Sequence, residues 1–337
     1  MKKNISICVV LLNLCNPCYT QDPHLSQYDA IPIYLNPAMT GLFNGYYRVH
    51  AHYRNQWASV ASPFVTSAIS YDMPYKKAGL GALIINNRAG IGNYNVLKFV
   101  TSGAYDITLI PEEQHHLSFG MQLGFIHKSV NMDKLLFRNQ YTRTNSIGFD
   151  PGLPSGEILE NTSIFLPELN AGLLYYFSSD KAFVNPFAGF SVFHLTQPNE
   201  SFFNNENKLP RRYVMHGGAK INISPIIQFT PQMLYMGQRN SREITMSIVG
   251  NYYFRSQDIW AFGGATYRIF HLNEFSTGDA IVALMGIKHG RYIYRFSYDI
   301  NTSSLSNISR GKGGFELSIT YIGGRLLPDI KPNCPRL

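Results

Sequence analysis

The ionisable side chains whose spacing could support chemistry lie near the N-terminal end, at every second position: Arg48, His50, His52 and Arg54. Histidines two residues apart on one strand share a face and can ligate a metal ion. The spacing supplies no third ligand, however, and the flanking arginines repel a cation. We therefore expect a polar stripe that pairs with carboxylates such as Glu316 and Asp299, with no cofactor and no metal site.

A second set of polar residues has the side chains that catalysis requires: Ser201, His194, Asp150 and His271. No spacing links a hydroxyl nucleophile to a base, and the G-x-S-x-G elbow is absent. The acidic residues Asp133, Asp150 and Glu157 are too widely spaced for a calcium loop. The sequence therefore predicts that the protein is not an enzyme.

Short segments of strict alternation must position these residues. Between residues 117 and 125, apolar residues occupy every odd position and small or polar residues every even one. The same pattern returns at 292–299 and 315–321. It predicts strands with one apolar, aromatic-rich face and one polar face, as in the wall of an outer-membrane β-barrel. We expect about fourteen strands, at 45–55, 62–72, 78–88, 95–109, 115–128, 167–178, 182–195, 211–223, 226–237, 242–255, 259–270, 279–288, 291–301 and 313–323.

The connections between these segments alternate in length, which supports an all-β, antiparallel, up-and-down transmembrane barrel. Every second connection is short and rich in turn residues, whereas the others include the long stretches 129–166 and 196–210. We expect the short turns in the periplasm and the longer loops outside the cell. Charged residues make up only 15% of the chain, against about 25% in soluble domains, which disfavours a soluble β-sandwich.

The two ends of the chain differ from the barrel at 45–323. Residues 1–20 have the basic start and short apolar run of a signal peptide, and 21–44 form a periplasmic segment that can fold back as a plug. Within it, Asn36 and Pro37 begin a capped helical turn that ends at Gly41. The proline-rich tail 324–337 is expected in the periplasm and holds Cys334, the sole cysteine after signal removal.

Charge and closure lead to two further expectations. The formal net charge is +8, but lysines and arginines are dispersed, so nucleic-acid binding is not expected. An even number of strands lets the strand around 45–55 pair antiparallel with the strand around 313–323. Arg54 and Glu316 should then both point into the barrel, on either side of the seam.

Several motifs resemble those of the PorP/SprF family of the type IX secretion system of Bacteroidetes. The matching segments, in order, are 21–28 (QDPHLSQY) with 35–38 (LNPA) and 40–41 (TG), 53–57 (YRNQW), 297–303 (SYDINTS), 314–318 (GFELS) and 334–337 (CPRL). Together they run from residue 21 to the C-terminus. Leu337 departs from the Phe or Tyr that usually ends family members.

This resemblance implies a function at the outer membrane of a Gram-negative, Bacteroidetes-like bacterium. Family members bind and anchor, or help to export, secreted surface proteins that carry a type B C-terminal sorting domain, gliding adhesins among them. The expected partners are such a cargo protein, periplasmic secretion components, and outer-membrane lipid and lipopolysaccharide. Candidate partner contacts are Asn36, Pro37, Cys334, Pro335 and Arg336. A passive diffusion channel for small polar solutes is the alternative.

Overall fold

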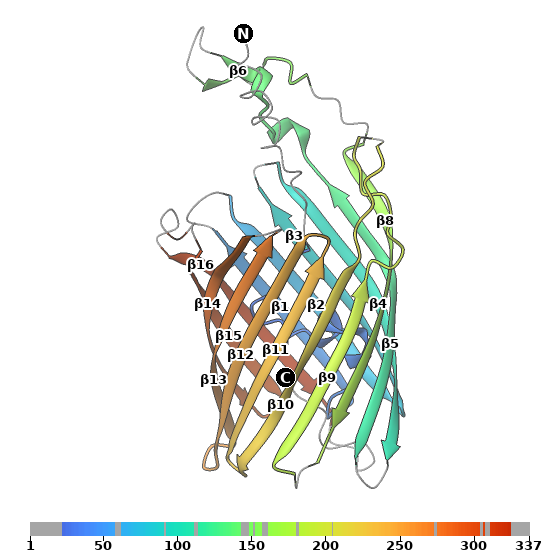
Figure 1. Ribbon diagram of the computed structural model, residues 1–337, viewed down its shortest axis with the longest axis vertical. Coiled ribbons are helices and arrows are strands. Elements are labelled where there is room, and N and C mark those ends of the chain that lie inside the picture. The colour runs from blue at the N-terminus through green and yellow to red at the C-terminus, as the bar shows by residue number, and fades with distance from the viewer. Residues whose placement is uncertain are drawn as a thin grey trace, which may run out of the picture.

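Fourteen strands form one closed antiparallel barrel in the part of the chain that the structure describes (Figure 1). The computed structural model describes residues 22–57, 62–90, 92–110, 114–142, 148–150, 152–156, 161–179, 182–203, 205–272, 275–303, 306 and 311–324. The strands are β1 (Tyr47–Gln56), β2 (Phe64–Tyr75), β3 (Ala78–Ala89), β4 (Tyr94–Ile110), β5 (His115–Ser129), β8 (Ser163–Phe177), β9 (Val184–Phe193), β10 (Arg212–Ser224), β11 (Ile227–Gln238), β12 (Ser241–Phe254), β13 (Ile259–Leu272), β14 (Phe275–His289), β15 (Tyr292–Asn301) and β16 (Lys312–Gly323). The predicted fold class and strand number are confirmed.

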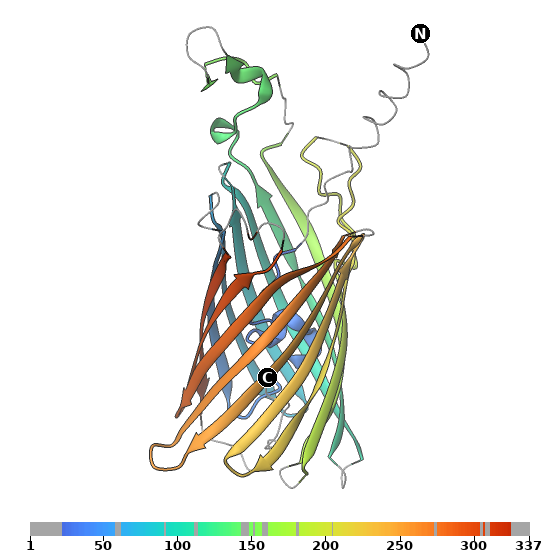
Figure 2. The same ribbon diagram turned by 60° about the vertical axis from the view of Figure 1, so that its left-hand side comes forward.

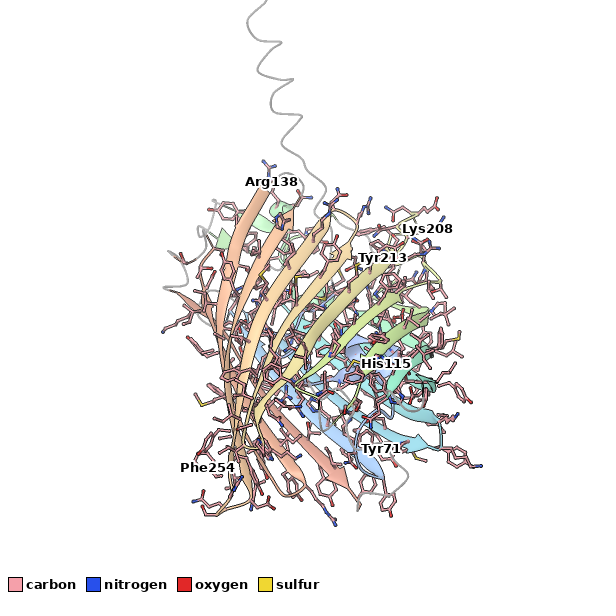
Figure 3. All side chains as sticks on the ribbon, turned by 60° about the horizontal axis from the view of Figure 1, so that its bottom comes forward. Tyr71, His115, Arg138, Lys208, Tyr213 and Phe254 are labelled. Atoms are coloured by element: carbon pink, nitrogen blue, oxygen red, sulfur yellow. The ribbon has the colours of Figure 1, made fainter. Side chains whose placement is uncertain are left out.

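Alternation along each strand separates an apolar outer face from a polar lumen. On β5, Phe119 and Leu123 are exposed on the outside, whereas Gln122 between them is buried inside the barrel. Tyr213 and Phe254, labelled in Figure 3, likewise lie on the outer surface. An exterior of aromatic and aliphatic side chains suits contact with lipid, and the polar faces are left to meet one another in the lumen.

The predicted strand boundaries differ from the observed ones mainly at two places. β8 begins at Ser163 instead of at 167, because the chain continues to pair with β5 beyond Pro167, which lies opposite Phe125. β14 begins at Phe275 instead of at 279, where it extends the ladder with β13. In both cases, pairing with a long neighbouring strand extends the strand past the residues that carry the alternation.

Closure of the barrel follows the predicted pairing. β1 pairs antiparallel with β16, and Arg54 lies directly opposite Glu316 in the register. Both side chains are buried. The seam between the first and last strands is therefore a continuous ladder like the other strand pairs.

The two ends of the barrel differ. At the short-turn end, consecutive strands are joined by tight connections such as residues 76–77 between β2 and β3. At the long-loop end, the connection between β5 and β8 contains η2 (Met132–Lys134), η3 (Arg138–Gln140) and the two-stranded sheet of β6 (Tyr141–Thr142) and β7 (Gly148–Phe149). This connection projects beyond the barrel in Figures 1 and 2. The sequence showed no sign of the small sheet.

Residues Asp22–Phe43, which we call the lumen segment, lie inside the ring of strands (Figure 2). The segment contains α2 (Pro32–Leu35) and η1 (Pro37–Met39). As predicted, Asn36 caps η1 by accepting a hydrogen bond from the Ala38 N–H, and Gly41 follows with a φ of 73°. The helix α2 was not predicted. No helix among the described residues is long and apolar enough to cross a membrane.

Candidate functional site

A cluster of buried charges at the seam holds the start of the lumen segment. Glu316 on β16 accepts hydrogen bonds from two backbone amides of that segment, Ser26 N–H at 2.6 Å and Gln27 N–H at 2.8 Å. The same carboxylate pairs with the Arg54 guanidinium, and His52 Nε2 lies 3.3 Å from its other oxygen. The Glu316 carboxylate therefore links the barrel wall to the lumen segment.

Ser26 lies at the centre of this cluster. Its hydroxyl donates to Asp299 Oδ2 at 2.7 Å and accepts from Arg54 at 2.7 Å and from Arg268 at 2.9 Å. Both guanidiniums also reach Asp299, at 3.1 Å and 3.2 Å. Burying ions is costly unless they are paired and hydrogen-bonded, so the charges on Arg54, Arg268 and Asp299 depend on one another for compensation.

A second charged cluster holds the first described residue of the segment near the long-loop end. Asp22 accepts from His194 Nε2 at 2.7 Å and lies 3.0 Å from Arg212. His194 in turn contacts Glu168 through Nδ1 at 2.8 Å, and Glu168 pairs with Lys98. The result is a chain of alternating charges from the lumen segment to β4.

Two groups of this cluster outside the strands have shifted pKa values. Burial alone raises the pKa of Asp22, but the charges of His194 and Arg212 outweigh it and hold that pKa well below the usual range. Burial alone lowers the pKa of His194, but Asp22 and Glu168 outweigh it and raise that pKa above the ordinary 6.5. Both shifts favour the ionised forms, a carboxylate on Asp22 facing an imidazolium on His194.

Polar side chains of the barrel wall also satisfy the backbone of the segment. Gln122 donates to the Ile33 carbonyl at 2.8 Å, Ser191 to the Leu35 carbonyl at 2.9 Å, and Ser118 to the Ala38 carbonyl at 2.8 Å. Buried backbone groups need such partners, and here the wall supplies them. The segment is thus bonded along its length instead of lying loosely in the lumen.

At two places the backbone of the lumen segment lies so close to the barrel wall that the wall residue must be small. A Cβ on Gly120 of β5 would lie 2.2 Å from the Pro37 carbonyl carbon, and one on Gly79 of β3 would lie 2.0 Å from the Thr40 oxygen. Such distances are far below van der Waals contact. Wall glycines therefore provide the space that η1 and the residues after it occupy.

In the structure, the residues of the predicted polar stripe take part in separate sets of contacts. Arg54, His52, Glu316 and Asp299 come together in the seam cluster. His50 instead contacts the Thr320 hydroxyl at 2.7 Å. Arg48 pairs with Asp72 on β2, which also accepts from the Gly41 N–H at 2.8 Å. Among the described residues, no group of three or more potential metal ligands lies together.

The remaining candidates are dispersed. Asn36 and Pro37 are buried, and Asn36 donates to the Leu173 carbonyl at 3.0 Å and contacts His216 at 3.1 Å. Cys334, Pro335, Arg336 and Glu157 lie outside the described residues. Of the residues considered for catalysis, His194 belongs to the Asp22 cluster, whereas Ser201 and Asp150 lie in two different loops and His271 lies on β13. Asp133, which was considered together with Asp150 as a calcium ligand, lies in η2 of the same loop as Asp150.

Sequence reasoning missed several residues that hold the lumen segment, namely Ser26, Asp22, Lys98, Glu168, Arg212 and Arg268. The position of one of these residues, Arg268, could have been predicted from the sequence. The alternation along β13 directs Arg268 into the barrel, since its neighbour Tyr267 is exposed on the outside. No local pattern indicates which wall residue meets Ser26.

Comparisons with known proteins agree with this architecture. The family model described as type IX secretion system membrane protein PorP/SprF matches residues 18–321. A crystal structure of a Pseudomonas aeruginosa FadL homologue is 9% identical, with 87% of this chain and 95% of that chain covered and a TM-score of 0.50. The P. putida toluene transporter TodX is also 9% identical, with 85% and 92% covered and a TM-score of 0.49. No curated protein matches the chain.

The likeness to the FadL homologue concerns the fold alone, which is a closed barrel of the outer membrane. The family is one of secretion-system membrane proteins. Membership in a secretion system also implies partners within that system. With the family model matched over nearly the whole chain, this protein belongs to the PorP/SprF family of type IX secretion system membrane proteins and is an outer-membrane β-barrel of Bacteroidetes.

Proposed function

We propose that this barrel binds a secreted surface protein through the C-terminal sorting domain of that protein, and that it anchors the cargo at the cell surface or assists its export. The family membership supports a role in secretion. Because the lumen is filled, the structure supports binding of a protein partner over passage of solutes through the barrel.

The filled lumen is the observation that carries the proposal. The lumen segment makes hydrogen bonds to residues of most strands: β1, β2, β4, β5, β8, β9, β10, β11, β12, β13, β15 and β16. Every residue from Leu25 to Phe43 is buried or half-buried. We infer that residues 22–44 are a resident plug, so the barrel offers its ends and loops to partners in place of an open pore.

The connection between β5 and β8 is the surface that we propose for the cargo. It extends beyond the barrel (Figure 2), past the strands whose apolar outer faces suit contact with lipid. Four large apolar side chains are nevertheless exposed on it: Leu136, Tyr141, Phe149 and Leu153. Exposed apolar groups in a solvated loop mark protein-binding surfaces.

Affinity purification from the native outer membrane tests this proposal. The wild-type barrel should retain a large secreted protein, and a Leu136→Glu, Leu153→Glu double variant should retain much less. Phe203→Glu, at an exposed position in the β9–β10 connection, serves as the matched control and should behave like the wild type. Recovery of the barrel alone under gentle solubilisation would argue against cargo binding.

Conductance in planar bilayers separates this function from a diffusion channel. A barrel of fourteen strands is wide enough for a water-filled lumen if nothing fills it. We expect almost no steady current from the wild type and a clear current after deletion of residues 22–43. A steady open pore in the wild-type protein would favour the channel.

A further inference from the structure

At one place along the long-loop end, the barrel wall ends in a tight hairpin. Only residues 239–240 join β11 to β12, whereas residues 130–162 lie between β5 and β8. The β5–β8 connection rises far above the barrel in Figure 1, and the β11–β12 hairpin has no such extension. The outer faces of β11 and β12 therefore reach the rim of the barrel without a long loop of their own.

A row of outward side chains crosses four strands just below this hairpin. Tyr213 on β10 lies opposite Gly237 on β11 in the register. Gly237 lies opposite Arg242 on β12, and Arg242 lies opposite His271 on β13. Arg242 is exposed, while the residues directly before and after it are buried inside the barrel. Because directly opposed residues share a face, all four point outward, and we call them the outer row.

The outer row carries an uncompensated positive charge. On the outer faces of β9 to β13, Arg242 is the only charged side chain among the residues that the structure describes. Arg211, also exposed, lies two residues before Tyr213 and so continues the outer face of β10. Neither arginine side chain has a hydrogen bond or an ion pair to another described residue. Both guanidiniums are therefore available to an anionic group from outside the chain.

Tyrosines on the same outer faces lie on the membrane side of the row. Tyr235 on β11 is two residues nearer the middle of the barrel than Gly237, and Tyr267 on β13 is four residues nearer than His271. Tyrosine side chains gather at membrane–water interfaces, where the ring lies at the level of the lipid headgroups. The outer row lies beyond these tyrosines, at the depth where lipid phosphates are found.

The glycine in the row leaves room for a headgroup. Neighbouring strands are about 4.8 Å apart, so Tyr213 and Arg242, on either side of Gly237, are separated by about 10 Å. A Cβ on Gly237 would lie 3.2 Å from the Tyr235 hydroxyl, which therefore forms part of the floor of this gap. Arginine binds phosphate through two parallel hydrogen bonds, and a tyrosine hydroxyl supplies a further donor. The gap thus has the donors that a phosphate requires.

We propose that the outer row binds the phosphate-bearing headgroup of an outer-leaflet lipid. Arg242 and Arg211 hold the phosphate, and the acyl chains lie along the apolar outer faces of β10 and β12, where Met215 and Met246 are exposed. These apolar side chains favour a lipid over a soluble anion, because a soluble anion makes no use of them. The site lies on the outer face of the wall, away from the β5–β8 connection, so it stands or falls independently of the cargo proposal.

Native mass spectrometry of the full chain released from detergent micelles tests the proposal. The probes are lipid A that carries phosphate and the same lipid A after its phosphates are removed. We expect the phosphorylated lipid to bind, and the dephosphorylated lipid to bind much more weakly. In the Arg211→Gln, Arg242→Gln double variant, affinity for the phosphorylated lipid should fall about tenfold, because two partly solvated charge pairs are lost.

Three controls make the outcome decisive. Arg88→Gln removes an exposed arginine from the outer face of β3 at the same end of the barrel and should leave affinity unchanged. Arg242→Lys keeps the charge and should bind the phosphorylated lipid more tightly than Arg242→Gln does. Heat-dependent mobility on gels reports whether each variant keeps a folded barrel.

Three results overturn the proposal. The first is equal affinity of the double variant and the wild type for the phosphorylated lipid. The second is equal affinity of the wild type for the lipid with and without phosphate, since the arginines would then make no contribution. The third is competition by inorganic phosphate at the same concentration as the lipid, because the site would then take a free anion.

Discussion

Replacing Glu316 with alanine should loosen the start of the lumen segment. The substitution removes the acceptor of the Ser26 and Gln27 amides and leaves Arg54 with only Asp299 as an acidic partner. Hydrogen bonds to a charged group contribute about 1.5–3 kcal/mol each, so the loss of two comes to about 4 kcal/mol. That free energy corresponds to about a thousandfold increase in the population of the opened segment.

Hydrogen–deuterium exchange with mass spectrometry measures this opening directly. Peptides that span Ser26 and Gln27 should exchange far faster in the alanine variant, while peptides from β4 and β5 should keep the wild-type rate. Glu316→Gln retains one acceptor oxygen and should give a smaller increase. Glu206→Ala removes an exposed ion pair with Lys208 and is the matched control, with no expected change.

Unchanged exchange at Ser26 and Gln27 in the Glu316→Ala variant would refute the reasoning. It would mean that the apolar contacts of the segment hold it in place without the seam cluster. Faster exchange throughout the barrel would also refute it, since the cluster would then stabilise the wall and not the segment.

Three further predictions concern other contacts of the chain. Gly120→Val should displace η1 and speed exchange across the lumen segment, whereas Gly103→Val on the neighbouring β4, where a Cβ meets nothing within 4 Å, should leave that exchange unchanged. Protection of the amides around Asp22, taken as their exchange rate relative to the intrinsic rate at the same pH, should be greatest between the two pKa values: protonation of Asp22 removes its contribution as pH falls through its lowered pKa, and deprotonation of His194 removes its contribution as pH rises above 6.5 through its raised pKa. The His194→Gln variant should lose the alkaline change, and a flat pH profile in the wild type would contradict the ion pair. Deleting residues 332–337 should leave barrel assembly and surface abundance intact but reduce cargo display, if the tail docks periplasmic components; unchanged display would rule out that role.

Much of the barrel could be predicted from sequence because its signals are local. Alternation of apolar and polar residues over eight or more positions, as around Phe119 and Gln122, specifies both a strand and its inward face. Closure then places the first strand beside the last, so the sequence predicts that Arg54 and Glu316 both point inward at the seam; the structure adds that they lie directly opposite each other. The capped turn at Asn36 was also predictable, because the cap involves only neighbouring residues.

The contacts of the lumen segment could not be predicted because they are distant in sequence. Ser26 meets Arg268 across 242 positions, and nothing near either residue indicates the partner. Arg48 was expected to face the seam, but it pairs with Asp72 on the other side of β1, since an inward arginine on β1 can reach either neighbouring strand. The path of a segment within a lumen depends on which wall positions are small, such as Gly120, and those glycines resemble ordinary strand residues in the sequence.

Surface retention of a reporter tests the central claim most directly. A fluorescent protein fused to the C-terminal sorting domain of the cognate secreted protein can be followed in cells that have the barrel, lack it, or carry the Leu136→Glu, Leu153→Glu variant. The reporter should stay on the cell surface only with the wild-type barrel, and barrel loss or the loop variant should remove it from the surface. Equal surface retention in all three strains would contradict a binding and anchoring role.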